Sequence, residues 1–88
     1  MTIIECVLLL EHGARVVEHS IADPCVQWAL FALADGRRLL FVERTYREGS
    51  TVILDPTEEE LAACRADPWT AWHSPRAEDD AILRPGEA

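Results

Sequence analysis

Runs of apolar side chains separated by turn residues dominate the first two thirds of the chain and predict β-strands. The first run, TIIECVLLL at residues 2–10, is apolar almost throughout, which is typical of a strand covered on both faces. A His-Gly pair at 12–13 indicates a turn. The next run, ARVVEHS at 14–20, predicts a second and shorter strand, so we expect the two strands to form a hairpin.

The segment CVQWALFALADGRRLLFVERTY, which follows Asp23-Pro24, is compatible with two interpretations. With Asp23 as the N-cap, Pro24 at the first helical position and Gly36 as a stop signal, residues 24–35 would form a helix. Alternatively, Asp35 and Gly36 form the two-residue type I′ turn of a β-hairpin. Strand-favouring residues on both sides of this turn favour the hairpin, and the helix stays an open alternative.

In the hairpin interpretation, side chains alternate between the two faces of the first strand, and Trp28 is expected in the core. One face is predicted to hold Val26, Trp28, Leu30 and Ala32. The other face is predicted to hold Gln27, Ala29, Phe31 and Leu33.

Residues 51–55, TVILD, predict a short strand, and the sequence DPTEEELAACRAD that overlaps its end carries the clearest local signal in the chain. Thr57 and Glu60 have the spacing of a capping box, T-x-x-E, at the start of a helix. Leu61 and Cys64 lie three residues apart and would both face the sheet. The sequence therefore predicts one short helix after the strands.

Two tryptophans follow this helix in the sequence DPWTAWH at residues 67–73. Asp67 can cap a second short turn with Pro68 at its first position, which would place Trp69 and Trp72 on one side of that turn. We expect at least one of the two rings to be largely buried against the sheet.

Strands followed by a helix predict an α+β fold: a small antiparallel β-sheet of four to five hairpin-connected strands with one short C-terminal α-helix packed on it. A chain of 88 residues has room for one domain, which we place at residues 1–73. Residues 74–88, SPRAEDDAILRPGEA, are expected to be an acidic C-terminal tail, with a composition typical of disorder.

Charge narrows the choice of partner, because 16 Asp and Glu residues stand against eight Arg and no Lys, a net charge of −8. Residues 51–88 carry nine of these acids and three of the arginines. Such a chain repels nucleic acid and anionic membranes, and it favours a protein partner with a basic surface. Arg37, Arg38, Arg44 and Arg47 are a local exception, and they either pair with the acidic tail or protect a strand edge.

The three cysteines, Cys6, Cys25 and Cys64, are widely separated and form no C-x-x-C pair, so they do not indicate a disulfide framework. Free cysteines are typical of a reducing compartment, and we expect a cytoplasmic protein. The longest apolar run is too short to cross a membrane.

Candidate catalytic and metal-binding residues are few. His12, His19 and His73 lack the paired short spacings of a zinc site, so neither metal nor cofactor is expected. Cys64 and His73 could meet in the fold, but an acid-rich helix would raise the pKa of the thiol. The motifs G-x-S-x-G, Walker A and G-x-G-x-x-G are absent, and we do not expect an enzyme.

Surface residues are therefore the main functional candidates, since tryptophan is typical of interface hot spots and acids suit a basic partner. The residues expected to contact a partner are Trp69, Trp72, Glu58, Glu59, Glu78, Asp79, Asp80, Arg37 and Arg38.

These features predict a small acidic protein-binding module that modulates or inhibits a larger partner, for example one that binds nucleic acid. Phage- or plasmid-encoded inhibitors, antitoxins and immunity proteins belong to this class. One alternative is a structural or accessory subunit of an enzyme complex that works as a homodimer. Another is a small enzyme or metal carrier that uses Cys and His.

Overall fold

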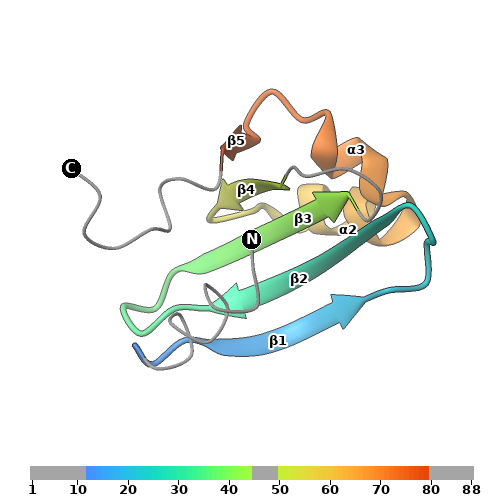
Figure 1. Ribbon diagram of the computed structural model, residues 1–88. Coiled ribbons are helices and arrows are strands. Elements are labelled where there is room, and N and C mark those ends of the chain that lie inside the picture. Colours follow the sequence, from blue (N-terminus) through green and yellow to red (C-terminus); the bar gives the residue numbers. More distant parts are fainter. Residues whose placement is uncertain (1–11, 45–49, 80–88) are drawn as a thin grey trace.

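An antiparallel sheet in the strand order β1-β2-β3-β4-β5 forms the centre of the molecule, and two short helices accompany it (Figure 1). The computed structural model describes residues 12–44 and 50–79. Neighbouring strands in the sheet are also consecutive in the sequence, so the sheet is a meander. The elements are β1 (Arg15–Ser20), β2 (Val26–Ala32), β3 (Arg38–Arg44), β4 (Ser50–Leu54), α2 (Glu58–Ala66), α3 (Pro68–Trp72) and β5 (Glu78–Asp79).

This arrangement confirms the predicted α+β fold. The strands predicted at 14–20 and 51–55 are present as β1 and β4, and the predicted helix is α2. The turn predicted to carry the two tryptophans is itself a five-residue helix, α3. The strand predicted at 2–10 lies outside the described residues.

The β2–β3 hairpin decides the alternative at residues 24–35 in favour of a strand, but its turn differs from the prediction. The Gly36 amide donates to the Leu33 carbonyl at 3.0 Å, and the Leu33 amide donates to the Arg37 carbonyl at 2.8 Å. The loop therefore has three residues rather than two. A type I′ turn needs positive φ at both central residues. Here Gly36 has a φ of 90°, but the φ of Asp35 is not positive.

Side chains of the sheet divide into two apolar clusters, as the alternation in the sequence predicts. Trp28 is buried, with 6% of its surface exposed, and belongs to the cluster on the helix face. The sheet residues of the helix-face cluster are Val26, Trp28, Leu30, Leu40, Val42 and Ile53. The buried residues of the opposite cluster are Phe31, Leu39, Phe41 and Val52, with Ala29, Leu33 and Leu54 packed against them.

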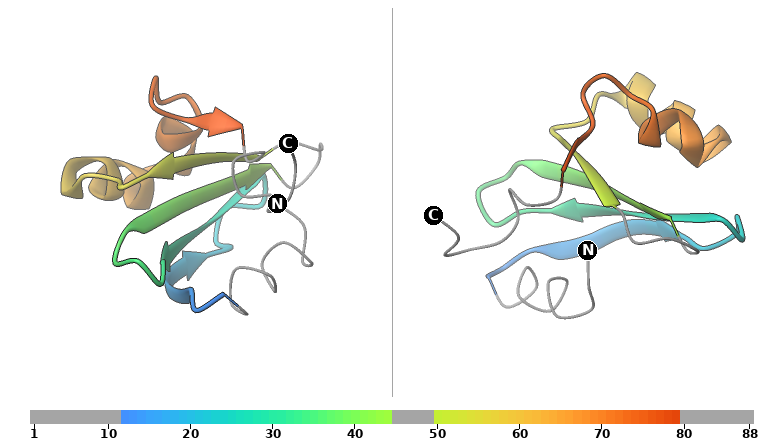
Figure 2. Two further views of the ribbon diagram at one scale, coloured as in Figure 1. Left: turned by 90° about the vertical axis from the view of Figure 1, so that its left-hand side faces the viewer. Right: turned by 45° about the horizontal axis from the view of Figure 1, so that its top comes forward.

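The two helices lie on one side of the sheet (Figure 2). Leu61 and Cys64 of α2 are fully buried in the helix-face cluster, as their spacing predicts, and Ala71 of α3 joins them there. Within the described ranges, neither helix has the length and apolar character needed to cross a membrane.

Residues after α3 return to the sheet and pair with β4. The Arg76 guanidinium donates to the carbonyl oxygens of Leu54 at 2.7 Å and Asp55 at 3.2 Å. Glu78 and Asp79 then pair with β4 as the two-residue strand β5. The predicted acidic tail thus lies along β4 as far as Asp79, and its remainder, including Asp80, is outside the described residues.

Candidate binding surface

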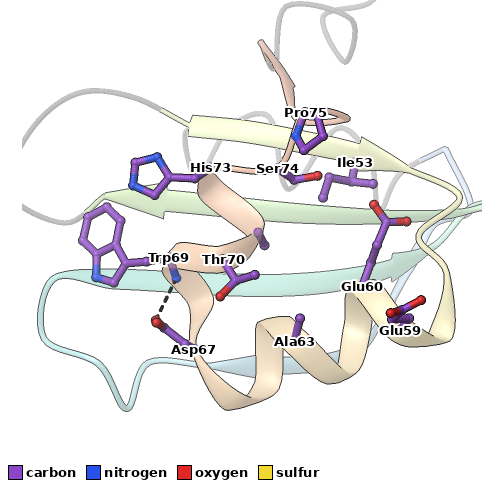
Figure 3. Close-up of a pocket in the computed structure, with 11 residues that line it drawn as sticks. Ile53, Glu59, Glu60, Ala63, Asp67, Trp69, Thr70, His73, Ser74 and Pro75 are labelled. Carbon is purple, nitrogen blue, oxygen red and sulfur yellow. Dashed lines mark hydrogen bonds between the residues drawn. The ribbon is translucent and has the colours of Figure 1, made fainter.

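A pocket of about 530 Å³ lies between α2, α3, β4 and the segment 73–75; we call it the helix pocket (Figure 3). β4 contributes the apolar side chain of Ile53, and α3 contributes Trp69 and Thr70. Three carboxylate residues also line the pocket, and no arginine does. These three are Glu59, Glu60 and Asp67.

A capping box fixes the α2 side of the helix pocket. The Thr57 hydroxyl accepts from the Glu60 amide at 3.1 Å, and the Glu60 carboxylate accepts from the Thr57 amide at 2.9 Å. The same carboxylate lies 3.5 Å from the guanidinium of Arg76, so much of its charge is compensated within the molecule. The neighbouring Glu59 is exposed and leaves a carboxylate at the pocket rim.

Asp67 connects the two helices and caps both of them. Its amide donates to the Ala63 carbonyl at 2.9 Å and ends α2, while its carboxylate accepts from the Trp69 amide at 3.1 Å and begins α3 (Figure 3). An N-cap carboxylate satisfies amides that the helix itself leaves unpaired. Asp67 is nevertheless exposed, so its carboxylate faces solvent at the pocket rim.

Trp69 and Trp72 are both partly buried and both pack against the helix-face cluster. This agrees with the expectation that at least one ring is largely buried against the sheet, although neither ring is fully buried. Their rings meet edge to face, with centroids 6.3 Å apart, and Trp69 also stacks on His73 at 6.2 Å. The Arg44 guanidinium lies 4.7 Å from the Trp72 ring centroid, a cation–π distance. Only Trp69 of the two lines the helix pocket.

The arginines predicted to form a basic patch contact acids near them in the fold. Arg37 pairs with Asp35 in the hairpin loop at 2.7 Å. Arg38 pairs with Glu58 at the start of α2 at 3.2 Å, and its guanidinium also donates to the Pro56 carbonyl. Arg38 begins β3, which is a central strand, and Arg37 lies in the loop before it, so the interpretation that these two arginines protect a sheet edge is wrong. Arg47 lies outside the described residues.

The partner-binding residues predicted from the sequence do not form one surface. Glu59 and Trp69 come together at the helix pocket. Glu58 pairs with Arg38 beside that pocket, and Arg37 lies at the hairpin loop. Glu78 and Asp79 lie on β5, at the edge of the sheet. The prediction therefore identified part of the pocket, and the other predicted residues that the structure describes lie outside its lining.

The set of partner-binding residues predicted from the sequence did not include five polar residues of the pocket: Glu60, Asp67, Thr70, His73 and Ser74. The sequence indicated that Glu60 and Asp67 are helix caps. A capping pattern does not show that the same side chains also line a pocket. His73 was detectable through its spacing of four from Trp69 and three from Thr70, because residues three and four apart share a helix face.

Cys64 is unsuited to nucleophilic chemistry, because its side chain is fully buried. Burial, with a smaller contribution from the charge of Glu18, raises the pKa of the thiol to about 11. The thiolate is therefore scarce at neutral pH. Among the described residues, no three His, Cys, Asp or Glu side chains are grouped to hold a metal ion.

No protein-family model, no curated protein and no solved structure matches this chain. Small α+β architectures support many unrelated activities, so the fold alone does not indicate a function. The helix pocket and the distribution of charge around it are the observations that bear on function.

Proposed function

We propose that this protein is a binding module that takes a basic segment of a larger protein into the helix pocket. The observation that carries this proposal is the lining of the pocket, which combines a tryptophan and an apolar base with three carboxylates and no arginine or lysine. Concave sites with apolar walls and a few polar groups are typical binding sites.

The distribution of intramolecular ion pairs supports the proposal that the helix pocket is acidic. Arg37, Arg38, Arg65 and Arg76 each pair with an acid of this chain. Glu59 and Asp67, in contrast, lie at the pocket rim with no arginine paired to them among the described contacts. Two carboxylates without an arginine partner thus lie at the pocket rim, where they attract a cationic group of a partner.

An arginine or lysine side chain of the partner fits this lining. Its aliphatic stem would pack on Ile53 and Ala63, because long cationic side chains bury their stems and keep the charged group near water. The charged group would lie near Glu59 and Asp67, and the Trp69 ring offers a cation–π surface.

A partner with a basic surface includes proteins that bind nucleic acid, and occupation of that surface would modulate or inhibit them. A phage- or plasmid-encoded inhibitor, antitoxin or immunity protein would act in this way. A second proposal, a homodimeric accessory subunit, is supported by a different region, the exposed apolar side chains around β1.

Titration of the isotope-labelled protein with a tri-arginine peptide, followed by NMR, tests the proposal. We expect the largest shifts at the Trp69 indole and at the amides of Glu59 and Thr70. Glu59→Gln and Asp67→Asn should each weaken binding by about two- to fivefold, the effect of a surface ion pair. Asn is also a good N-cap, so Asp67→Asn keeps α3 intact.

Asp35→Asn is the matched control, because it removes the same charge at the hairpin loop, outside the pocket lining. We expect it to leave the affinity nearly unchanged at physiological salt, where distant charges are screened. Equal weakening by Asp35→Asn, or equal shifts with a tri-glutamate peptide, would contradict a specific pocket for cationic side chains.

A further inference from the structure

The two rim carboxylates of the helix pocket lie at opposite ends of α2. Glu59 belongs to the first turn of α2, and Asp67 is the residue at which the helix ends. Ala63 lies midway between them, and its carbonyl accepts from the Asp67 amide at 2.9 Å in the helical pattern. Residues four apart share a helix face, and Figure 3 shows Glu59, Ala63 and Asp67 in this order along the pocket.

Helix geometry sets the distance between these two acidic residues. Glu59 and Asp67 are eight positions apart. Each residue advances an α-helix by about 1.5 Å, so the two backbone positions are separated by about 12 Å along the axis. A charged hydrogen bond needs a donor within about 3 Å of its acceptor. A single cationic group between the two residues is near both, but each carboxylate is matched best by a cation of its own.

The other charges near the helix pocket are compensated within the molecule. Glu60 lies 3.5 Å from the guanidinium of Arg76, and Arg65 of α2 pairs with an acid of β1 and does not line the pocket. Glu59 has no arginine partner among the described ion pairs. Asp67 accepts from a neutral amide, which leaves its charge uncompensated. One negative charge therefore remains at each end of the pocket.

Between these charged ends, apolar side chains line the middle of the helix pocket. β4 contributes Ile53, α2 contributes Ala63 and α3 contributes Ala71. Ile53 and Ala71 have 1% and 4% of their surfaces exposed, so they form the base of the pocket. An apolar group of a partner suits this position, because its removal from water is favourable, whereas burial of a charge without a partner is costly.

We propose that the helix pocket recognises an extended peptide segment with two basic residues four positions apart and an apolar residue midway between them. This inference rests on the proposed function and specifies the basic segment. In an extended chain every second side chain points to the same side, and residues four apart are separated by about 13 Å. That distance matches the separation of Glu59 and Asp67. A helix, about 10–12 Å wide with its side chains, is too wide to enter a pocket of about 530 Å³.

Two pentapeptides of equal charge, blocked at both ends, test this spacing: Arg-Ala-Val-Ala-Arg and Arg-Arg-Val-Ala-Ala. In the second peptide the adjacent arginines point to opposite sides of an extended chain, so only one of them can face the pocket. NMR titration of the full-length labelled protein measures both affinities. We expect the first peptide to bind about two- to fivefold more tightly, the contribution of a second exposed ion pair. Its binding should shift the amides of both Glu59 and Trp69.

Variants of the two carboxylates show whether they read the spacing. Glu59→Gln and Asp67→Asn should each make the two peptides bind equally, because either change leaves one end of the pocket without its charge. Asp35→Asn removes the same charge outside the pocket lining and should keep the preference for the first peptide. The ratio of the two affinities is the measured quantity, since a general change in net charge acts on both peptides alike. Circular dichroism checks that each variant is folded.

Equal binding of the two peptides to the unchanged protein would overturn the predicted spacing and would leave the proposed function standing. Binding of neither peptide would overturn both. A preference that persists in Glu59→Gln and in Asp67→Asn would show that other acids read the peptide, which would also overturn this inference. So would transferred nuclear Overhauser effects typical of a helical turn in the bound peptide.

Discussion

The helix layer and the first strand complete the sheet in different ways. α2 and α3 cover one face with fully buried Leu61 and Cys64 and end in side-chain caps. β1 extends the sheet by one row of hydrogen bonds but leaves Val16 and Val17 about half exposed. The first region adds buried apolar surface, and the second adds mainly backbone pairing.

This difference separates stability from surface available for association. Apolar area removed from water contributes about 25 cal/mol per Å², so α2 should contribute much more to folding than the side chains of β1 do. Exposed apolar side chains of β1 would contribute only when another surface covers them. If matched truncations in the two regions lowered the free energy of unfolding equally, this difference between α2 and β1 would not hold.

The largest expected effect is that of Leu61→Ala in α2. Leu61 has 1% of its surface exposed and packs in the helix-face cluster. Its truncation should lower the free energy of unfolding by about 2–5 kcal/mol, since it loses transfer energy and leaves a cavity. Urea denaturation at low protein concentration measures this loss.

Val17→Ala is the matched truncation in β1. Val17 has 54% of its surface exposed. Its effect on the free energy of unfolding should be within about 0.5 kcal/mol at low protein concentration. A loss as large as that of Leu61→Ala would show that Val17 is buried in solution and would erase the contrast between the two regions.

Removal of the α2 N-cap has an intermediate expected effect. Thr57→Ala removes one of the two hydrogen bonds of the capping box, the one from the Glu60 amide to the Thr57 hydroxyl, whereas the amide of residue 57 can still donate to the Glu60 carboxylate. We expect a loss of about 1 kcal/mol in urea denaturation, while Thr57→Ser should keep nearly full stability. An equal loss in both variants would mean that the methyl group, and not the hydroxyl, matters.

The fold was largely predictable because its determinants are local. Alternation at 26–33 assigned Trp28 and Phe31 to opposite faces, and the T-x-x-E spacing at Thr57 located the start of α2. The hairpin turn was not predictable in detail, because Asp-Gly is compatible with both a two-residue and a three-residue loop. The backbone φ of Asp35 decides between them.

The candidate site was predictable only in part, because it depends on contacts between segments far apart in the chain. Ile53 meets Trp69 only after α2 and α3 fold back onto β4. Arg44 reaches Trp72 across 28 positions of sequence and gives it a cation partner within the molecule. No local pattern distinguishes that tryptophan from Trp69, which lines the pocket.

Another small effect is expected from the ion pair that joins the two regions, between Glu18 of β1 and Arg65 of α2. Hydrogen bonds from Arg65 lower the pKa of Glu18 below its ordinary value of 4.5. The pair therefore stabilises the fold fully above pH 4.5, and this contribution is lost as pH falls through the lowered pKa. Glu18→Gln should destabilise the protein at neutral pH and have little effect in acid.

The loss should be smaller than that of Thr57→Ala, because both side chains are more than a third exposed and water weakens their attraction. Urea denaturation of the monomer across the acid range, with Glu59→Gln as the control carboxylate, measures the difference. A double-mutant cycle with Arg65→Gln isolates the pair. A coupling that persists in acid would contradict a charge interaction, and the connection between β1 and α2 would then rest on packing.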